Sequence, residues 1–264
     1  MIDIYFHIDD VKHEAPKSWQ DVTFDRFLKY FDEVAPHEPA VLKEFIKAHG
    51  EAIFALSEKL TQEQKEQEAK WLFMERWNAL ASKAQIECYN FFALDVAFWC
   101  GVSATQIKEG LDKDTLFAAY WALQAQMNPD NAEVNEEYTG FELEGVEYLV
   151  PNKHMIGSTV DEFSSAAQFQ EDMNHLKAGN WRSMLDVMTV LCRPKGELYN
   201  SDKLFTATRK NLFRTLPMTD VINVAFFLLK LNEQLRVTLA IYTTQQELSR
   251  MQPKSLVIAT DGQQ

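Results

Sequence analysis

Glycine is scarce in this sequence, and its scarcity removes the usual phosphate-binding loops from consideration. Nine glycines occur among the 264 residues, and none falls in the GxGxxG or GxxxxGK[ST] spacing. Those spacings matter because they let several backbone amides crowd around one phosphate group. A GxSxG turn, which would present a nucleophilic serine ahead of a helix, is missing as well. The sequence therefore predicts neither a nucleotide-binding protein nor an acyl-transfer enzyme.

Cysteine and histidine are also few, and their positions do not suggest a metal site. Cys88, Cys100 and Cys192 lie far apart in apolar stretches and form no CxxC pair. We therefore expect buried, reduced thiols rather than a disulfide framework. The six histidines are scattered, and the sequence contains neither HExxH nor a cysteine–histidine cluster with zinc spacing. We predict no metal ion and no cofactor.

Uninterrupted apolar runs are lacking too. The most apolar stretch, Val221 to Tyr242, is broken by Asn223, Lys230 and Arg236 among other polar residues. A helix that crosses a bilayer needs about 20 nearly uncharged residues, so this stretch is not one. The first residues do not show a basic segment followed by an apolar one, so we expect no signal peptide. These features favour a soluble intracellular protein that does not contact a membrane.

Charge is present in excess of one sign and is unevenly distributed. The formal net charge is −13; residues 1–173 hold 14 Lys and Arg against 32 Asp and Glu, whereas residues 174–236 hold 10 against 5. Because an acidic body repels phosphates, we predict no DNA or RNA partner. The basic stretch supplies a candidate partner surface formed by Arg193, Lys195, Lys203, Arg209, Lys210 and Arg214. The equal alternative is that the chain's own acidic half satisfies these charges.

The spacing of apolar residues predicts a mainly helical protein of the α+β class. Ile2 to Ile8 alternate with polar residues, as in a half-buried N-terminal strand. Residues 141–150 form two alternating runs around Glu144-Gly145, which predicts a β-hairpin with a two-residue turn. Thr23 has the character of a helix cap. A capping box at Thr159 and Glu162 predicts a further helix through residue 169.

Three further helices are predicted: one that is packed only in its later turns, one that is central and buried, and one that is long and C-terminal. Residues 61–80 begin polar and become apolar from Trp71 through Trp77, which predicts solvated first turns and packed later turns. The aromatic segment 86–100 is predicted to be a central buried helix. A stripe from Val224 to Tyr242 predicts a long C-terminal helix that continues to about residue 250 and either projects or ends early, near residue 236.

Two regions follow from these patterns. Residues 1–130 form an acidic, aromatic-rich helical region, and residues 138–250 form a second region with the hairpin and the long helix. Residues 251–264 lack periodicity and are expected to be a flexible tail. One continuous domain over residues 1–250 is the alternative.

One acidic residue and one short segment invite a functional interpretation. Asp95 lies inside the aromatic helix, where burial would raise its pKa, although such residues more often face a Lys, an Arg or a helix end. Residues 98–109 imitate a DNA-reading helix-turn-helix with Gly101 at the turn. Because Lys108 is followed by Glu109 and two further acids, we interpret the segment as an ordinary turn between helices.

The second half of the chain carries an order of features found in one group of proteins. The features are Leu149-Val150-Pro151, residues 159–169, Trp181 to Leu191, Arg193-Pro194, Tyr199, Arg209, Phe213, Leu216-Pro217 and Phe226-Phe227. This order resembles poorly characterised proteins encoded in the structural modules of tailed phages and prophages of Bacteroidetes, near the tail-tube and tape-measure genes. The resemblance covers a little over a third of the chain and includes no catalytic motif.

The resemblance implies a tail-assembly chaperone or a minor virion component. Such a protein acts through contacts with tail or capsid subunits or through self-association, in the bacterial host cytoplasm or in the virion, and is not an enzyme. The alternative is a hydrolase or small-molecule-binding protein whose site is assembled from distant residues, around Asp95 and the aromatic helices.

Overall fold

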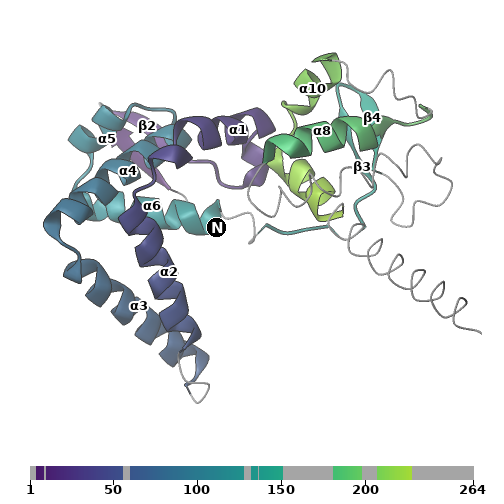
Figure 1. The fold of residues 1–264 in the computed structure, drawn as a ribbon. Coiled ribbons are helices and arrows are strands. Elements are labelled where there is room, and N and C mark those ends of the chain that lie inside the picture. The colour runs from purple at the N-terminus through teal and green to yellow at the C-terminus, as the bar shows by residue number, and fades with distance from the viewer. Residues whose placement is uncertain are drawn as a thin grey trace, which may run out of the picture. The chain divides into compact units, whose positions relative to one another are not determined.

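A computed structural model describes residues 4–8, 10–55, 60–127, 132–135, 137–150, 181–197 and 207–227. These residues are mainly helical and include two small antiparallel sheets, which confirms the predicted α+β class (Figure 1). The chain divides into two compact units. Unit 1 comprises residues 1–133 together with 211–221, and unit 2 comprises residues 134–210 and 222–264. Residues 211–221, which lie in the second predicted region, therefore belong to unit 1.

Unit 1 contains a strand pair and six α-helices among its described residues. The elements are β1 (Tyr5–Ile8), β2 (Val11–Glu14), the short 3-10 helices η1 (Trp19–Asp21) and η2 (Ala35–His37), α1 (Phe24–Glu33), α2 (Ala40–Phe54), α3 (Gln62–Ala79), α4 (Ser82–Cys100), α5 (Ala104–Gly110) and α6 (Lys113–Gln126). The predicted N-terminal strand is β1, which pairs with β2 in register Tyr5 to Glu14. Asp10 turns the chain between them with a positive φ of 62°.

Short polar side chains fix where these helices begin. Thr23 accepts a hydrogen bond from the Arg26 amide at the start of α1, as predicted. Thr61 and Gln64 form a capping box ahead of α3. The Asp112 side chain caps α6 by accepting hydrogen bonds from the Asp114 and Thr115 amides. Helix α4 ends before Gly101, whose φ of 70° is the left-handed conformation that glycine adopts without strain.

The core of unit 1 forms around α4, as the aromatic content of this helix predicts. Nine of its residues are buried, among them Phe91, Phe92 and Trp99. Phe92 stacks on Tyr120 of α6 with ring centroids 3.9 Å apart, and it also stacks on Trp77 of α3 at 5.7 Å. Cys88, Cys100 and also Cys192 of unit 2 are buried free thiols.

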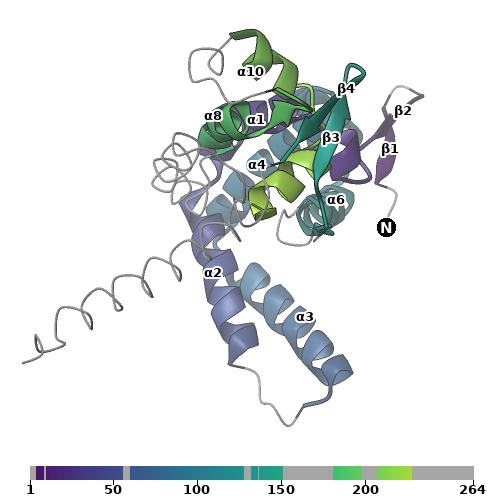
Figure 2. The same cartoon turned by 90° about the vertical axis from the view of Figure 1, so that its right-hand side faces the viewer.

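Helices α2 and α3 form an antiparallel hairpin that extends away from α4 (Figures 1 and 2). Near α4 the hairpin is packed by rings, since Phe45 meets Phe73 at 5.0 Å and Trp77 at 5.6 Å. Farther out the apolar side chains are open to solvent, and Phe54 is 94% exposed. The predicted packing of Trp71 is wrong, because its side chain is 56% exposed.

Residues 211–221 complete unit 1 by binding the start of α1. The amides of Phe24 and Asp25 donate to the carbonyls of Leu216 and Arg214, both at 2.8 Å. The Met218 amide donates to the Val22 carbonyl at 2.7 Å. We call residues 211–221 the strap.

Unit 2 contains a three-stranded sheet in the order β3 (Gly140–Leu143), β4 (Val146–Leu149) and β5 (Arg193–Pro194), with α8 (Trp181–Leu191). The predicted hairpin is confirmed. Its turn residues, Glu144 and Gly145, both have positive φ, as a tight two-residue turn requires. Gly140 must stay glycine, because an added Cβ would lie 2.1 Å from the Tyr148 carbonyl oxygen.

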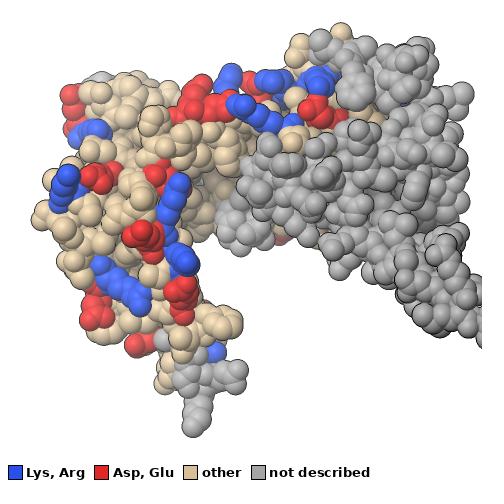
Figure 3. Space-filling view, in the orientation of Figure 1, with Lys and Arg blue, Asp and Glu red and all other residues tan. Residues whose placement is uncertain are grey.

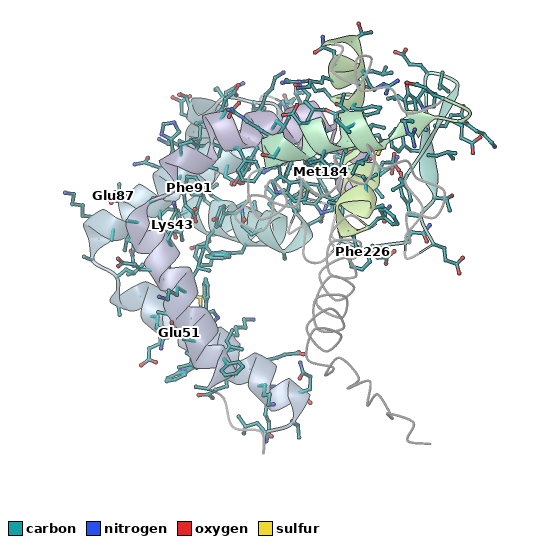
Figure 4. The ribbon with its side chains drawn as sticks, turned by 45° about the vertical axis from the view of Figure 1, so that its right-hand side comes forward. Lys43, Glu51, Glu87, Phe91, Met184 and Phe226 are labelled. Atoms are coloured by element: carbon teal, nitrogen blue, oxygen red, sulfur yellow. The ribbon has the colours of Figure 1, made fainter. Side chains whose placement is uncertain are left out.

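Three predicted elements fall wholly or partly outside the described residues. A further helix among the described residues is α10 (Ala207–Phe213). Of the long C-terminal helix, residues 218–227 are helical, with Phe226 near the end of the described part (Figure 4), and its continuation lies outside. The helix expected after Thr159 and the tail 251–264 lie outside as well. Over the described ranges, no helix is both long and apolar enough to cross a membrane.

Candidate functional site

The predicted basic surface is paired with carboxylates of the same chain. Lys195 lies 2.7 Å from Glu147, Lys210 pairs with Asp186, and Arg214 of the strap lies 3.0 Å from Asp25. Arg209 donates to both carboxylate oxygens of Glu197, at 2.9 and 2.7 Å. Arg193 is half-buried in β5, and Lys203 lies outside the described residues.

Two of these acids, Asp25 and Glu147, belong to the acidic half that the alternative names, whereas Asp186 and Glu197 lie within the basic stretch itself. The Arg209 side chain is only 12% exposed, so its pair with Glu197 supports the fold. The other pairs are more exposed and contribute about 0–1 kcal/mol each. Among the described residues on the face shown in Figure 3, basic and acidic side chains are interspersed and form no patch of one sign.

Asp95 is a buried acidic side chain of unit 1, and it joins three helices. Its side chain on α4 is 0% exposed. The Tyr30 hydroxyl of α1 donates to Asp95 Oδ2 at 2.7 Å, and the Gln124 amide of α6 donates to the same oxygen at 3.2 Å. The other oxygen, Oδ1, is buried and has no hydrogen-bond partner. A buried carboxylate of this kind more often faces a Lys, an Arg or a helix end, but the two donors to Asp95 are the neutral side chains of Tyr30 and Gln124.

Burial dominates the electrostatics of this cluster. It raises the pKa of Asp95 to about 7, although the hydrogen bonds from Tyr30 and Gln124 oppose the rise. This confirms the predicted direction. Burial and the nearby Asp95 charge together raise the pKa values of the Tyr30 and Tyr120 hydroxyls. Burial raises the pKa of the Cys100 thiol to about 12, so this thiol is not a nucleophile at neutral pH.

A carboxyl group with a pKa near 7 has the proton affinity of a general acid or base. Catalysis also requires that substrate reach the group, and Asp95 is completely buried within the helices. The cluster therefore holds α1, α4 and α6 together through polar contacts. Arg26 adds to this attachment, because its guanidinium donates to the Phe98 and Trp99 carbonyls at 3.2 and 2.6 Å.

A small pocket opens between α3, α4 and the start of α6, and we call it the α3–α4–α6 pocket. Its volume is about 150 Å³. The pocket is lined by the rings of Trp77, Tyr89 and Phe117, by Met74, and by the polar residues Asn78, Gln85, Lys113 and Asp114. The burial of Tyr89 raises the pKa of its hydroxyl, which therefore stays a neutral hydrogen-bonding group.

Three exposed apolar side chains, one of which lines the pocket, lie on α3 and α4. Met74 is 41% exposed, and Trp71 lies one turn before it on the same face of α3. Ile86, at the start of α4 and three residues before Tyr89, is 61% exposed. We call Trp71, Met74 and Ile86 the apolar rim. The sequence interpretation missed it, although the spacing offered a signal: Trp71 and Trp77 are six residues apart and cannot share a helical face.

Metal binding finds no support in the geometry of the described ranges, where no three His, Cys, Asp or Glu side chains converge as ligands. No protein-family model matches this chain, and neither a curated protein nor a solved structure is significantly similar to it.

Proposed function

We propose that this chain is a non-enzymatic assembly protein that acts through protein–protein contacts, as a tail-assembly chaperone or minor virion component of a tailed phage. Its partners are tail or capsid subunits, or a second copy of the chain, and it acts in the bacterial host cytoplasm or in the virion. The observation that supports contact-based function is the apolar rim beside the α3–α4–α6 pocket.

The apolar rim has the properties of a binding anchor. An exposed tryptophan next to an exposed methionine leaves apolar surface in water, which is unfavourable until a partner covers it. Tryptophan dominates binding energies at interfaces because it buries a large area with few rotatable bonds. Covering Trp71 and its neighbours therefore stabilises a complex by removing this surface from water.

The pocket is sized for a side chain rather than for a cofactor. Small-molecule sites usually occupy about 300–1,000 Å³. The volume found here, about 150 Å³, is about that of a cavity that holds a single benzene ring. Polar residues share the lining with the three rings, so a subunit side chain with an apolar face and a polar edge suits the pocket.

Co-purification with co-expressed tail subunits tests this proposal. Trp71→Ser should lower the amount of retained subunit at least tenfold, because it removes the largest exposed anchor. Val11→Thr is the matched control, since Val11 is also an exposed apolar residue, 56% accessible, but lies on β2. If Trp71→Ser retains as much subunit as the wild type, the apolar rim does not bind the subunit.

Charge reversal shows whether the subunit binds to the apolar rim or to the basic stretch. Lys195→Glu combined with Lys210→Glu removes two exposed ion pairs without touching the buried Arg209 pair. If the basic stretch binds the subunit, this variant loses binding and the wild-type complex weakens in high salt. If the apolar rim binds it, both effects stay small.

A hydrolase or small-molecule-binding protein remains the second candidate, because the pKa of Asp95 is raised to about 7. A ligand that reaches Asp95 should raise the melting temperature of the wild-type protein and not that of Asp95→Asn. A ligand screen in which both proteins respond alike would exclude Asp95 as the site.

A further inference from the structure

Helix α1 is attached to the rest of unit 1 partly through a carboxyl group that lacks a counter-charge. Asp95 is fully buried, one of its oxygens accepts two hydrogen bonds, and the other has no partner. Both donors are neutral side chains. An ionised carboxylate in such a place is unfavourable, because water is excluded and no cation replaces it.

The groups that surround Asp95 add no positive charge at its oxygens. Tyr30 and Arg26 face the cluster from α1, Tyr120 and Gln124 from α6, Glu38 from the segment after η2, and Cys100 from α4 itself. Of these, Glu38 adds negative charge. Arg26 acts on the carbonyls at the end of α4 and on the Cys100 thiol.

Helix α1 covers an aromatic surface of α4. The Tyr30 ring stacks on Trp99 with centroids 5.1 Å apart and meets Phe98 at 5.6 Å. The same helix carries the backbone hydrogen bonds to the strap. A change that loosens α1 would therefore uncover rings of α4 and release the strap together.

We propose that Asp95 is a proton-operated latch for α1. With a proton on Asp95, α1 stays seated on α4 and α6; when the proton leaves, α1 loosens and uncovers the aromatic surface around Trp99. The purpose of this opening rests on the proposed function, since an uncovered aromatic surface would serve a chaperone that receives apolar subunits. The latch itself does not depend on any partner.

The direction of the pH effect follows from where the proton binds more tightly. Burial raises the pKa of Asp95 from 3.8 to about 7 in the closed form. In the open form the carboxyl is solvated and has a pKa near its ordinary value. The closed form is therefore favoured below about pH 4, and this advantage is lost as the pH rises to about 7.

Amide hydrogen exchange of α1 at pH 6 and pH 8 tests the latch on the full chain without any partner. After correction for the intrinsic exchange rates, the opening equilibrium of α1 should rise about tenfold between these pH values. Asp95→Asn cannot ionise and should remove the difference. Glu87→Gln is the matched control: it makes the same chemical change at an exposed position of the same helix, which Figure 4 labels.

Tyr30→Phe provides a second, independent variant. It removes one of the two hydrogen bonds that stabilise the ionised carboxylate, so the pKa of Asp95 in the closed form should rise, and the increase in α1 opening should continue to a higher pH before it levels off. This shift can be measured even if Asp95→Asn does not fold. Equal protection of α1 at pH 6 and pH 8 in the wild type overturns the proposal, and so does a pH difference that persists in Asp95→Asn. Loss of subunit capture with an intact pH difference would contradict the proposed function alone.

Discussion

Aromatic residues are buried in the core around α4 but exposed on the outer half of the α2–α3 hairpin. Around α4, rings from three helices enclose Phe92, which is 0% exposed. On the hairpin, Phe54 is 94% and Trp71 is 56% exposed. The same residue types therefore stabilise the fold in one region and remain available for contacts in the other. Four substitutions measure how far this difference holds.

The largest effect is expected from Phe92→Ala. Removing a fully buried ring that stacks 3.9 Å from Tyr120 leaves a cavity that the surrounding helices can close only in part. The free energy of unfolding should fall by about 3–5 kcal/mol, measured by urea denaturation. A loss below 1 kcal/mol would mean that the core around α4 is loosely packed, and the contrast with the hairpin would disappear.

Asp95→Asn should raise the free energy of unfolding at high pH, by less than Phe92→Ala lowers it. Because burial raises the pKa of Asp95 from 3.8 to about 7, ionisation costs the folded state about 4 kcal/mol at pH 8. An unpaired amide N–H in the variant costs about 1–3 kcal/mol in return. The variant should be more stable than the wild type by about 1–3 kcal/mol at pH 8, and this gain should shrink toward pH 4. Denaturation at several pH values checks the slope; a gain that grows toward low pH contradicts it.

Thr61→Ala should weaken only the start of α3. It removes the acceptor for the Gln64 amide in the capping box, which contributes about 1 kcal/mol. Since the outer hairpin buries little, the effect should appear as about fivefold faster exchange of amides in the first turns of α3. Asp112→Ala, which removes the side chain that caps α6, is the comparison within the packed region. Slower or unchanged exchange in α3 would show that other contacts hold the outer hairpin.

Phe54→Ala should change stability least. The substitution removes the same ring as Phe92→Ala, but from a side chain that is 94% exposed. Substitutions at such surface positions usually stay within about 0.5 kcal/mol. Paired urea denaturation of the two variants gives the direct test. A large loss in Phe54→Ala would mean that the outer hairpin is covered in solution, as in a complex between copies.

Features set by neighbouring residues could be predicted from the sequence. The turn at Glu144-Gly145, the cap at Thr23 and the buried helix 86–100 each depend on patterns within a few residues, and the structure confirms all three. The pKa direction of Asp95 also followed from local context, because an apolar helix on all sides implies burial.

Features set by distant residues could not be predicted in the same way. Asp95 meets Tyr30 and Gln124, which lie 65 and 29 residues away, and Arg214 meets Asp25 across 189 residues. No periodicity encodes such pairings. The apolar rim could not be predicted for a related reason. An apolar residue of α3 is buried only if it lies on the side of the helix that α4 covers, and the sequence does not show which side that is.

The strap ties the order of synthesis to the order of folding. Residues 1–133 leave the ribosome first, yet the amides at the start of α1 lack their acceptors, the carbonyls of Arg214 and Leu216, until the strap has been made. At about 5–20 residues per second, translation of the intervening segment takes several seconds. During that interval the nascent chain has an incomplete N-terminal unit, a period in which ribosome-associated chaperones would have access to it. Truncation before the strap should therefore damage the N-terminal half first.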